Sequence, residues 1–295
     1  MVKVWLSMAA SEILRIAAST RMQKLSGLIR HGSTMVNRME LQLQQRKTTG
    51  KLRALQPLDS GIQLIDFCSN DYLGFSRNEK LMMKIESNWA SYKSKQPPGT
   101  PYLGSTGSRL LTGNSFAYVE TEKYLAQFHG HPNCLLANSG WDLNYGLLSC
   151  VPSDNTVVFY DELSHNSLVM GLRGGRGLEK VSFKHNDLEE LRNLLRNSNK
   201  LGEGRDVEKL IIVESIYSMD GDICPIKDLL DLAKEFNAMV IIDEAHSTGI
   251  IGDRGEGLTS SLNLQLHPNL LGEIRSEHCI FSPCVDDIRL SRKVV

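Results

Sequence analysis

Short apolar runs alternate with longer amphipathic segments along most of this chain, and this alternation limits the possible folds more than any other feature. Buried strands are predicted at 134–137, 157–160, 209–213 and 239–242. Helices are predicted at 116–129, 143–151, 187–197 and 228–236. Strands that alternate with helices form a sheet that helices cover on both faces. The sequence therefore predicts an α/β fold with a mostly parallel sheet.

The N-terminal part differs in composition from the rest. Residues 1–38 hold six Lys or Arg, five Ser and a single acid, Glu12. This pattern is typical of an organellar presequence, and an ordinary helix that docks on the domain is the alternative. A leading helix at 39–56 and a short strand at 62–67 are expected next. We divide the chain into a basic N-terminal segment (1–38), a helix and strand segment (39–96), a large domain (97–260) and a tail (261–295).

Acidic residues follow two of the predicted strands directly. Glu214 comes after the run 209–213, and Asp243 comes after 239–242, with one predicted helix between the strands. A strand–helix–strand crossover makes its two strands parallel, so both acids reach the same edge of the sheet. That edge is where open α/β sheets bind ligands. Asp161, after the run 157–160, can join them there.

The stretch 239–249 offers a carboxylate and an imidazole at a strand end. A carboxylate that faces a pyridine nitrogen keeps this nitrogen protonated, and a protonated pyridine ring is an electron sink for a carbanion. Asp243 and His246 could hold such a ring by its nitrogen and its phenolic oxygen. The alternative is an Asp that caps a helix beside an unrelated His.

Two further motifs are weaker when each is taken alone. The small residues Ser139 and Gly140 precede a predicted helix, whose N-terminal N–H groups could bind phosphate, although a plain strand-to-helix turn is the favoured explanation of this motif by itself. His165 follows another apolar run and could stack on an aromatic cofactor, or it could be an ordinary structural His.

Several other functional classes are not supported. The formal net charge of -1 gives no sign of a nucleic-acid partner, and no apolar run reaches the roughly 20 residues of a membrane span. Scattered cysteines without Cys-x-x-Cys favour a reduced intracellular protein. Asp243, Glu244, His129 and His131 lack the third-ligand spacing of a metal site. Neither a nucleotide-binding glycine motif nor Gly-x-Ser-x-Gly occurs.

Taken together and in this order, the motifs resemble those of the α-oxoamine synthases, which are pyridoxal-phosphate (PLP) acyltransferases of fold type I. The resemblance covers about 67–257, and it rests on the segments 69–74, 104–109, 139–140, 161–165, 214–222 and 243–249. The Gly-Ser-x-Gly-Ser-Arg form of 104–109 is most similar to the 8-amino-7-oxononanoate synthases of biotin biosynthesis. The resemblance implies the large domain of fold type I and a homodimer. It also implies condensation of an amino acid with an acyl-CoA or acyl-carrier thioester.

The resemblance also implies roles for single residues. Asp243 would pair with the pyridine nitrogen, His246 would contact the phenolic oxygen, and His165 would stack on the ring. The phosphate would be held by Ser139, Gly140 and Trp141. The remaining implied site residues are Glu214 and Ser218 in the pocket and Asn70 near the amino acid.

The chain departs from the family pattern at several positions. Trp141 and Asp142 replace the usual Phe-Ala, and Ser115 and Tyr118 stand where the family often has His. An acid beside a phosphate site is unfavourable unless it faces away.

The family's Schiff-base Lys follows the strand-end Asp by roughly thirty residues, whereas here Lys293 is the sole Lys after Asp243. The usual small C-terminal domain is also absent, and 272–295 loses family character. We therefore expect an inactive chain, or alternatively a non-catalytic partner subunit of an active synthase, in the cytoplasm or the mitochondrion.

Overall fold

The computed structural model describes residues 34–53, 65, 67–100, 105–275 and 280–283. The chain divides into two units, Met1–Ser69 and Asn70–Val295. In the first unit the structure describes helix α2 (Met35–Thr48), whose N-cap Thr34 accepts a hydrogen bond from the backbone of Asn37. The predicted presequence lies almost wholly outside the described residues.

The second unit is built on a seven-stranded sheet with the order β1-β7-β6-β5-β4-β2-β3. Its strands are β1 (Leu135–Leu136), β2 (Thr156–Asp161), β3 (Glu179–Phe183), β4 (Glu208–Glu214), β5 (Met239–Asp243), β6 (Leu270–Arg275) and β7 (Ile280–Pro283). The pairs from β3 through β2, β4 and β5 to β6 are all parallel, and β7 runs antiparallel to both neighbours. The prediction of a mostly parallel sheet is confirmed.

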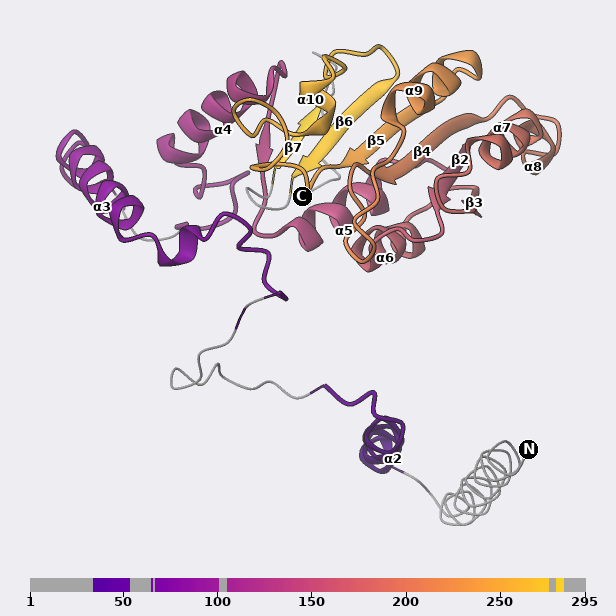
Figure 1. Cartoon of the computed structure of the whole chain (residues 1–295), viewed down its shortest axis with the longest axis horizontal. Helices are drawn as coiled ribbons and strands as arrows, with labels where there is room; N and C mark the ends of the chain where they lie inside the picture. Colours follow the sequence, from indigo (N-terminus) through magenta and orange to yellow (C-terminus); the bar gives the residue numbers. More distant parts are fainter. Residues whose placement is uncertain (1–33, 54–64, 66, 101–104, 276–279, 284–295) are drawn as a thin grey trace. The chain divides into compact units, whose positions relative to one another are not determined.

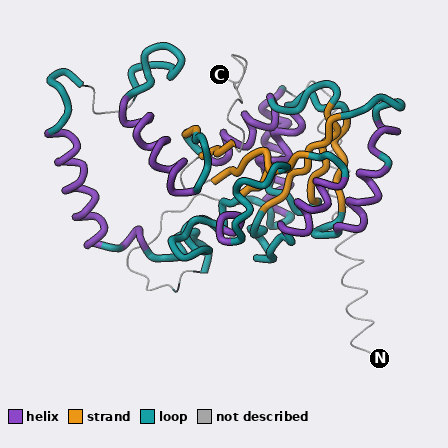
Figure 2. The backbone as a smooth tube through the Cα atoms, turned by 90° about the horizontal axis from the view of Figure 1, so that it is seen from above, coloured by secondary structure: helices purple, strands orange, loops and turns teal. Residues whose placement is uncertain are grey.

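Helices cover both faces of this sheet, as Figure 1 shows. One layer consists of α5 (Gly140–Cys150) and α6 (Asn166–Gly174), and the other contains α7 (Leu188–Arg196), α9 (Ile226–Glu235) and the short α10 (Leu258–Ser261). The remaining described helices of this unit are η1 (Phe75–Arg77), α3 (Glu79–Ser94), α4 (Phe116–His129) and α8 (Ser198–Leu201). Seen from above, the strands lie centrally between the helices (Figure 2).

The two layers bury separate hydrophobic clusters. Leu143, Leu148 and Leu168 belong to the cluster between the sheet and the α5/α6 layer. Leu191 and Leu229 belong to the cluster on the opposite face. Successive strand residues point to opposite faces, so each strand contributes alternate side chains to the two clusters. A polar residue at a strand end therefore faces α5 and α6 only if an even number of positions separates it from the strand residues that pack there. We call two residues with this even spacing residues of the same parity.

Most predicted elements are present with shifted ends, and a few predictions need correction. The leading helix spans Met35–Thr48 rather than 39–56. Of the predicted strand at 62–67, the described positions 65 and 67 are not in a strand, and the others lie outside the described residues. Besides β6 and β7, the elements that were not predicted are η1, α3, α6, β3, α8 and α10.

Part of the predicted tail belongs to the sheet. Residues Leu270–Arg275 form β6 and pair with β5, with Asp243 opposite Ile274. Leu270 and Ile274 are fully buried. This segment has the ordinary pattern of a buried strand, which the interpretation of 261–295 as a tail did not use.

Candidate functional site at the carboxyl edge of the sheet

A cavity of about 200 Å³ lies at the carboxyl ends of β4 and β5, beside the start of α5. It is lined by Asn70, Gly140, Trp141, Asn144, His165, Ser167, Glu214, Asp243, Ala245 and His246. Seven of the predicted site residues thus come together from five separate segments of the chain. Ser139 and Ser218 do not line this cavity: Ser139 caps α5, and Ser218 is exposed.

Glu214 and Asp243 enter the cavity from neighbouring strands. They lie opposite each other at the last paired position of β4 and β5, and both are buried. Both side chains point toward the α5/α6 layer because they share the parity of Ile212 and Ile241, which pack there. The prediction that the two acids meet at one edge is confirmed.

Asp161 does not join them, although its strand ends at the same edge. It has the parity of Val157 and Phe159, which belong to the cluster on the other face. Its carboxylate is buried there and accepts hydrogen bonds from His185 Nδ1 at 2.9 Å and from the backbone of Asn186 at 2.8 Å. The expectation that it joins the site was wrong.

Asp243 is held by two hydrogen bonds. Its Oδ1 accepts from the backbone N–H of Ala245 at 2.9 Å, and its Oδ2 accepts from Asn144 Nδ2 at 2.9 Å. Burial raises the pKa of this carboxyl, and the Asn144 hydrogen bond opposes that shift. Among the described residues no Lys or Arg is ion-paired with Asp243. The site therefore suits a cationic N–H donor.

Glu214 is the second buried carboxyl in the cavity. Burial, and then the nearby Asp243, raise the pKa of Glu214 to about 8. Its Oε1 accepts a hydrogen bond of 2.5 Å from the backbone N–H of His165. At neutral pH this carboxyl is mostly protonated, which avoids two adjacent negative charges.

The two histidines of the site have defined partners. His246 Nδ1 shares a hydrogen bond of 2.8 Å with the hydroxyl of Tyr72, and burial lowers the pKa of its imidazole. His165 Nδ1 shares a hydrogen bond of 2.6 Å with Ser167 Oγ. Tyr72, Asn144, Ser167 and Ala245 were not predicted as functional residues. For Asn144 a signal existed, because an amide between Leu143 and Leu147 on a buried helix face needs partners.

The start of α5 presents its first turn to the cavity. Ser139 caps the helix by accepting from the backbone N–H of Asp142 at 3.0 Å, and Gly140 and Trp141 line the cavity. N–H groups of a helix N-terminus are suited to an anion such as phosphate. Trp141 stacks on Tyr145 with ring centroids 5.4 Å apart.

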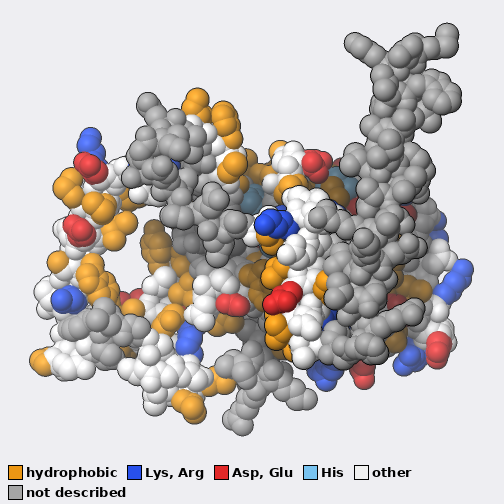
Figure 3. Space-filling model, turned by 90° about the horizontal axis from the view of Figure 1, so that it is seen from below, with side chains coloured by type: hydrophobic (Ala, Val, Ile, Leu, Met, Phe, Trp, Pro, Cys, Tyr) orange, Lys and Arg blue, Asp and Glu red, His pale blue; other side chains and the backbone are white. Residues whose placement is uncertain are grey.

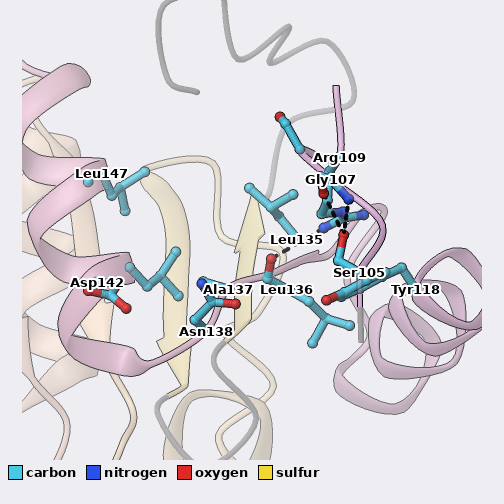
Figure 4. Close-up of a pocket in the computed structure, with 13 residues that line it drawn as sticks. Ser105, Gly107, Arg109, Tyr118, Leu135, Leu136, Ala137, Asn138, Asp142 and Leu147 are labelled. Atoms are coloured by element: carbon cyan, nitrogen blue, oxygen red, sulfur yellow. Dashed lines mark hydrogen bonds between the residues drawn. The ribbon is translucent and has the colours of Figure 1, made fainter. Parts of the chain in front are cut away.

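Asp142 does not face the site cavity that Gly140 and Trp141 line. It lines a second cavity of about 460 Å³ together with residues of β1 and of the loop that carries Arg109, as Figure 4 shows. Arg109 itself is paired with Glu122 at 2.6 Å. The acid that seemed incompatible with a phosphate site therefore belongs to a different surface.

The described residues show neither a metal site nor a membrane-spanning helix. No group of three or more His, Cys, Asp or Glu in these ranges has the arrangement of a metal site. Within the same ranges, helices with the length and apolar character needed to span a bilayer were not found.

Comparison with known proteins identifies similar sequences. The family model described as "Aminotransferase class I and II" matches residues 62–272. The chain is 34% identical over 237 residues to the 8-amino-7-oxononanoate synthase of Emericella nidulans, which covers 76% of this chain and 56% of that protein. It is 38% identical over 209 residues to the aminoacyl transferase sphA of Byssochlamys spectabilis, covering 68% and 43%. The chain thus spans about half the length of these relatives.

Solved structures give a concordant result. A high-resolution structure of SPT with PLP matches with a TM-score of 0.61 and 27% identity, over 73% of this chain and 52% of that one. The serine palmitoyltransferase of Sphingomonas wittichii matches with a TM-score of 0.68 over 85% and 64%, and at 22% identity it shows the fold alone. The predicted fold type is confirmed, and PLP is bound in the first of these structures.

Proposed function

Because this chain belongs to the aminotransferase class I and II family, we propose that it binds PLP in the cavity between β4, β5 and α5. We further propose that its activity is the condensation of an amino acid with an acyl thioester. The observation that carries the proposal is the buried carboxylate of Asp243, which has no cationic partner among the described residues and faces a cavity beside a helix N-terminus.

The residues present fit this cofactor. A protonated pyridine nitrogen would supply the missing positive charge at Asp243. The buried Oδ1 of Asn144, which has no hydrogen-bond partner within the described part of the chain, offers one more acceptor in the same cavity. The N-terminal turn of α5 suits the phosphate group. When bound, PLP supplies a ring that withdraws electrons from the α-carbon of an amino acid.

The residues of this chain would then have distinct tasks. Asp243 keeps a proton on the pyridine nitrogen, because an opposite charge favours the charged form. His246, which Tyr72 holds, would contact the phenolic oxygen, and His165 would cover the ring. Asn70 and Trp141 lie in the cavity wall, where an amino acid would enter.

The substrate class is a finer proposal. The form of 104–109 and the relative in Emericella nidulans favour an 8-amino-7-oxononanoate synthase, which belongs to biotin biosynthesis. A relative of comparable identity is named aminoacyl transferase sphA, so a different acyl substrate is the competing proposal. A thioester competition assay with several acyl chain lengths distinguishes these proposals.

The position expected for the Schiff-base Lys is in or next to β6. Roughly thirty residues after Asp243 the chain reaches Glu273, Ile274 and Arg275, and no Lys follows until Lys293. Ile274 lies opposite Asp243 and is packed in the cluster under α5. We propose that a chain of this sequence binds the cofactor non-covalently and does not catalyse the condensation by itself.

A single experiment tests both the binding of PLP and the lack of catalysis. The full chain is titrated with PLP and followed by fluorescence, and release of free thiol from acyl-CoA is measured with an amino acid present. We expect saturable binding that Asp243→Asn weakens, together with thiol release at the background rate. Failure of the chain to bind PLP at millimolar concentration would overturn the cofactor assignment, and steady thiol release would overturn the inactivity.

A non-catalytic partner subunit is the second candidate. It is favoured by the lack of a Lys in β6, whereas the assembled cofactor residues argue against it. Hydrophobic side chains are visible between charged ones on the face in Figure 3, and α3 exposes Met82, Met83, Ile85 and Trp89. Size-exclusion chromatography of the chain with and without an intact synthase distinguishes a mixed complex from the predicted homodimer.

We propose a cytoplasmic or mitochondrial location for this chain. A cytoplasmic or mitochondrial location rests on residues 1–38, most of which lie outside the described part of the chain.

A further inference from the structure

A continuous line of hydrogen bonds connects the two predicted cofactor residues Asp243 and His165. Asn144 Nδ2 donates to Asp243 Oδ2 at 2.9 Å and to Ser167 Oγ at 2.8 Å. Ser167 Oγ in turn lies 2.6 Å from His165 Nδ1. Asn144, Ser167 and Asp243 are all buried. The line therefore crosses from the end of β5, through α5 and α6, to the segment after β2.

The direction of each hydrogen bond follows from the groups involved. A carboxylate accepts, so the side of Asn144 that faces Asp243 must be its NH₂ group, since the opposite amide orientation would place two acceptors together. Ser167 Oγ accepts from the same NH₂ group, which leaves its own proton for His165 Nδ1. The backbone N–H of Ser167 also points to this nitrogen at 3.3 Å. His165 Nδ1 is therefore an acceptor.

The close approach of α5 and α6 makes this line possible. A Cβ atom at Gly171 would lie 2.8 Å from the carbonyl oxygen of Asn144 and 3.0 Å from Leu148 Cβ. Only a residue without a side chain lets α6 come near enough for Ser167 to reach the amide on α5. An amide buried at this position costs folding free energy unless it is hydrogen-bonded, so its presence calls for an explanation beyond packing.

We propose that Asn144 and Ser167 are positioning residues that orient the carboxylate of Asp243 and fix the ring proton of His165 on Nε2 before any cofactor is bound. The identity of the ligand in this inference rests on the proposed function. The orientation of Asp243 and His165 in the free protein rests on the hydrogen bonds alone. Neither residue belongs to the set predicted from the family resemblance.

Charged and titratable groups surround Asp243 on several sides. Glu214 on β4 is its neighbour across the sheet, His165 and His246 lie in the same cavity, and Ile274 on β6 is apolar. The hydrogen bond from Asn144 is the largest influence that lowers the pKa of Asp243 against the effect of burial. Removing this donor should thus make Asp243 take up a proton at a higher pH.

The first test uses the full chain without cofactor. Carbon-13 NMR of labelled Asp carboxyl groups follows the titration of Asp243, which is assigned with Asp243→Asn. We expect Asn144→Ala to raise the titration midpoint by about one pH unit, and Ser167→Ala to raise it by less, because a hydrogen bond to a charged group has this order of strength. The matched control is Asn269→Ala, which removes a buried amide that donates to Ala238 O at 2.8 Å in another part of the sheet.

Nitrogen-15 NMR of labelled histidine then gives the tautomer of His165. We expect the proton on Nε2 at a pH where the ring is neutral. Protonation of Nδ1 instead, or an Asp243 midpoint that Asn144→Ala leaves unchanged, would overturn the proposal. A midpoint that moves with Asn144→Ala but not with Ser167→Ala overturns the continuous line.

The second test measures PLP affinity against pH. If binding needs ionised Asp243, affinity falls on the acid side, and Asn144→Ala should move this fall upward by about one pH unit, which is about tenfold in affinity at a fixed acidic pH. Ser149→Ala, a hydroxyl removal elsewhere on α5, should leave the profile unchanged. If the unaltered chain takes up no PLP, the proposed function fails while the NMR titration still decides this inference.

Discussion

Glu214 and Asp243 occupy the last paired position of β4 and β5, so two buried carboxyl groups face one cavity from adjacent strands. Burial and the charge of Asp243 raise the pKa of Glu214 from 4.5 to about 8. The folded protein therefore binds a proton at Glu214 that the unfolded chain releases above pH 4.5. Stability from this group is complete below that pH and is lost as the pH rises toward 8.

Glu214→Gln should remove this dependence, because Gln resembles the neutral carboxyl and does not ionise. We expect the free energy of unfolding of the variant to exceed that of the unaltered chain at pH 8.5 by an amount on the order of a few kcal/mol, and to differ little at pH 5. Urea unfolding between these pH values measures it. Parallel pH profiles of the two proteins would contradict the assignment.

Asp243→Asn should weaken PLP binding by about 10- to 100-fold, because it removes the charge from a buried hydrogen-bonded partner. Asp142→Asn is the matched control: it alters an acid near the same helix start, but one that lines the other cavity. We expect the control to bind within about twofold of the unaltered chain, since its charge lies outside the site. Equal losses of affinity in both variants would show that PLP binding depends on the overall negative charge near the start of α5 rather than on the position of Asp243.

Tyr72→Phe should weaken PLP binding by about 3- to 10-fold, the effect of losing one neutral hydrogen bond. The hydroxyl of Tyr72 lies 2.8 Å from His246 Nδ1 and holds the imidazole in one orientation. Tyr124→Phe on α4 removes an exposed hydroxyl away from the site and serves as the control. Fluorescence titration compares the three proteins, and unchanged affinity in Tyr72→Phe would show that His246 is oriented without it.

The sequence was sufficient for the strands whose hydrophobic runs are uninterrupted and for the acids that follow them. The sequence was less informative about which face of the sheet a side chain points to. Asp161, Glu214 and Asp243 all end parallel strands, yet only the last two face the cavity, because the parity of the apolar residues before them differs. That difference becomes visible only when it is known which helix layer covers which face.

Contacts between distant segments were beyond prediction, even where a single residue such as Asn144 carried a signal of its own. Asn144 and Ser167 are separated by 23 positions and Tyr72 and His246 by 174, and no local pattern indicates either pair. The segment Leu270–Arg275 was not predicted as a strand, although its apolar residues have a strand-like pattern. The structure also places Glu273 and Arg275 with His131 and Glu244 in a buried charged cluster on the far face.

Gly171 is the position where the packing of α5 on α6 is most sensitive to change. An added Cβ would meet backbone and side-chain atoms of α5 at 2.8 and 3.0 Å, so Gly171→Ala should push the helices apart. We expect a loss of about 1–3 kcal/mol in the free energy of unfolding, as for other overpacked interiors. PLP affinity should fall too, because Ser167 moves away from Asn144.

Gly146→Ala gives the matched comparison on the facing helix. Apart from the neighbouring backbone of α5, no atom of the described residues lies within 4 Å of a Cβ at this position, and Gly146 is inside α5. Ala is favoured over Gly in a helix interior, so this variant should gain about 0.5–1 kcal/mol. Urea unfolding of the two variants therefore gives shifts of opposite sign. Equal shifts would mean that α5 and α6 do not approach as closely at Gly171 as the described contacts require.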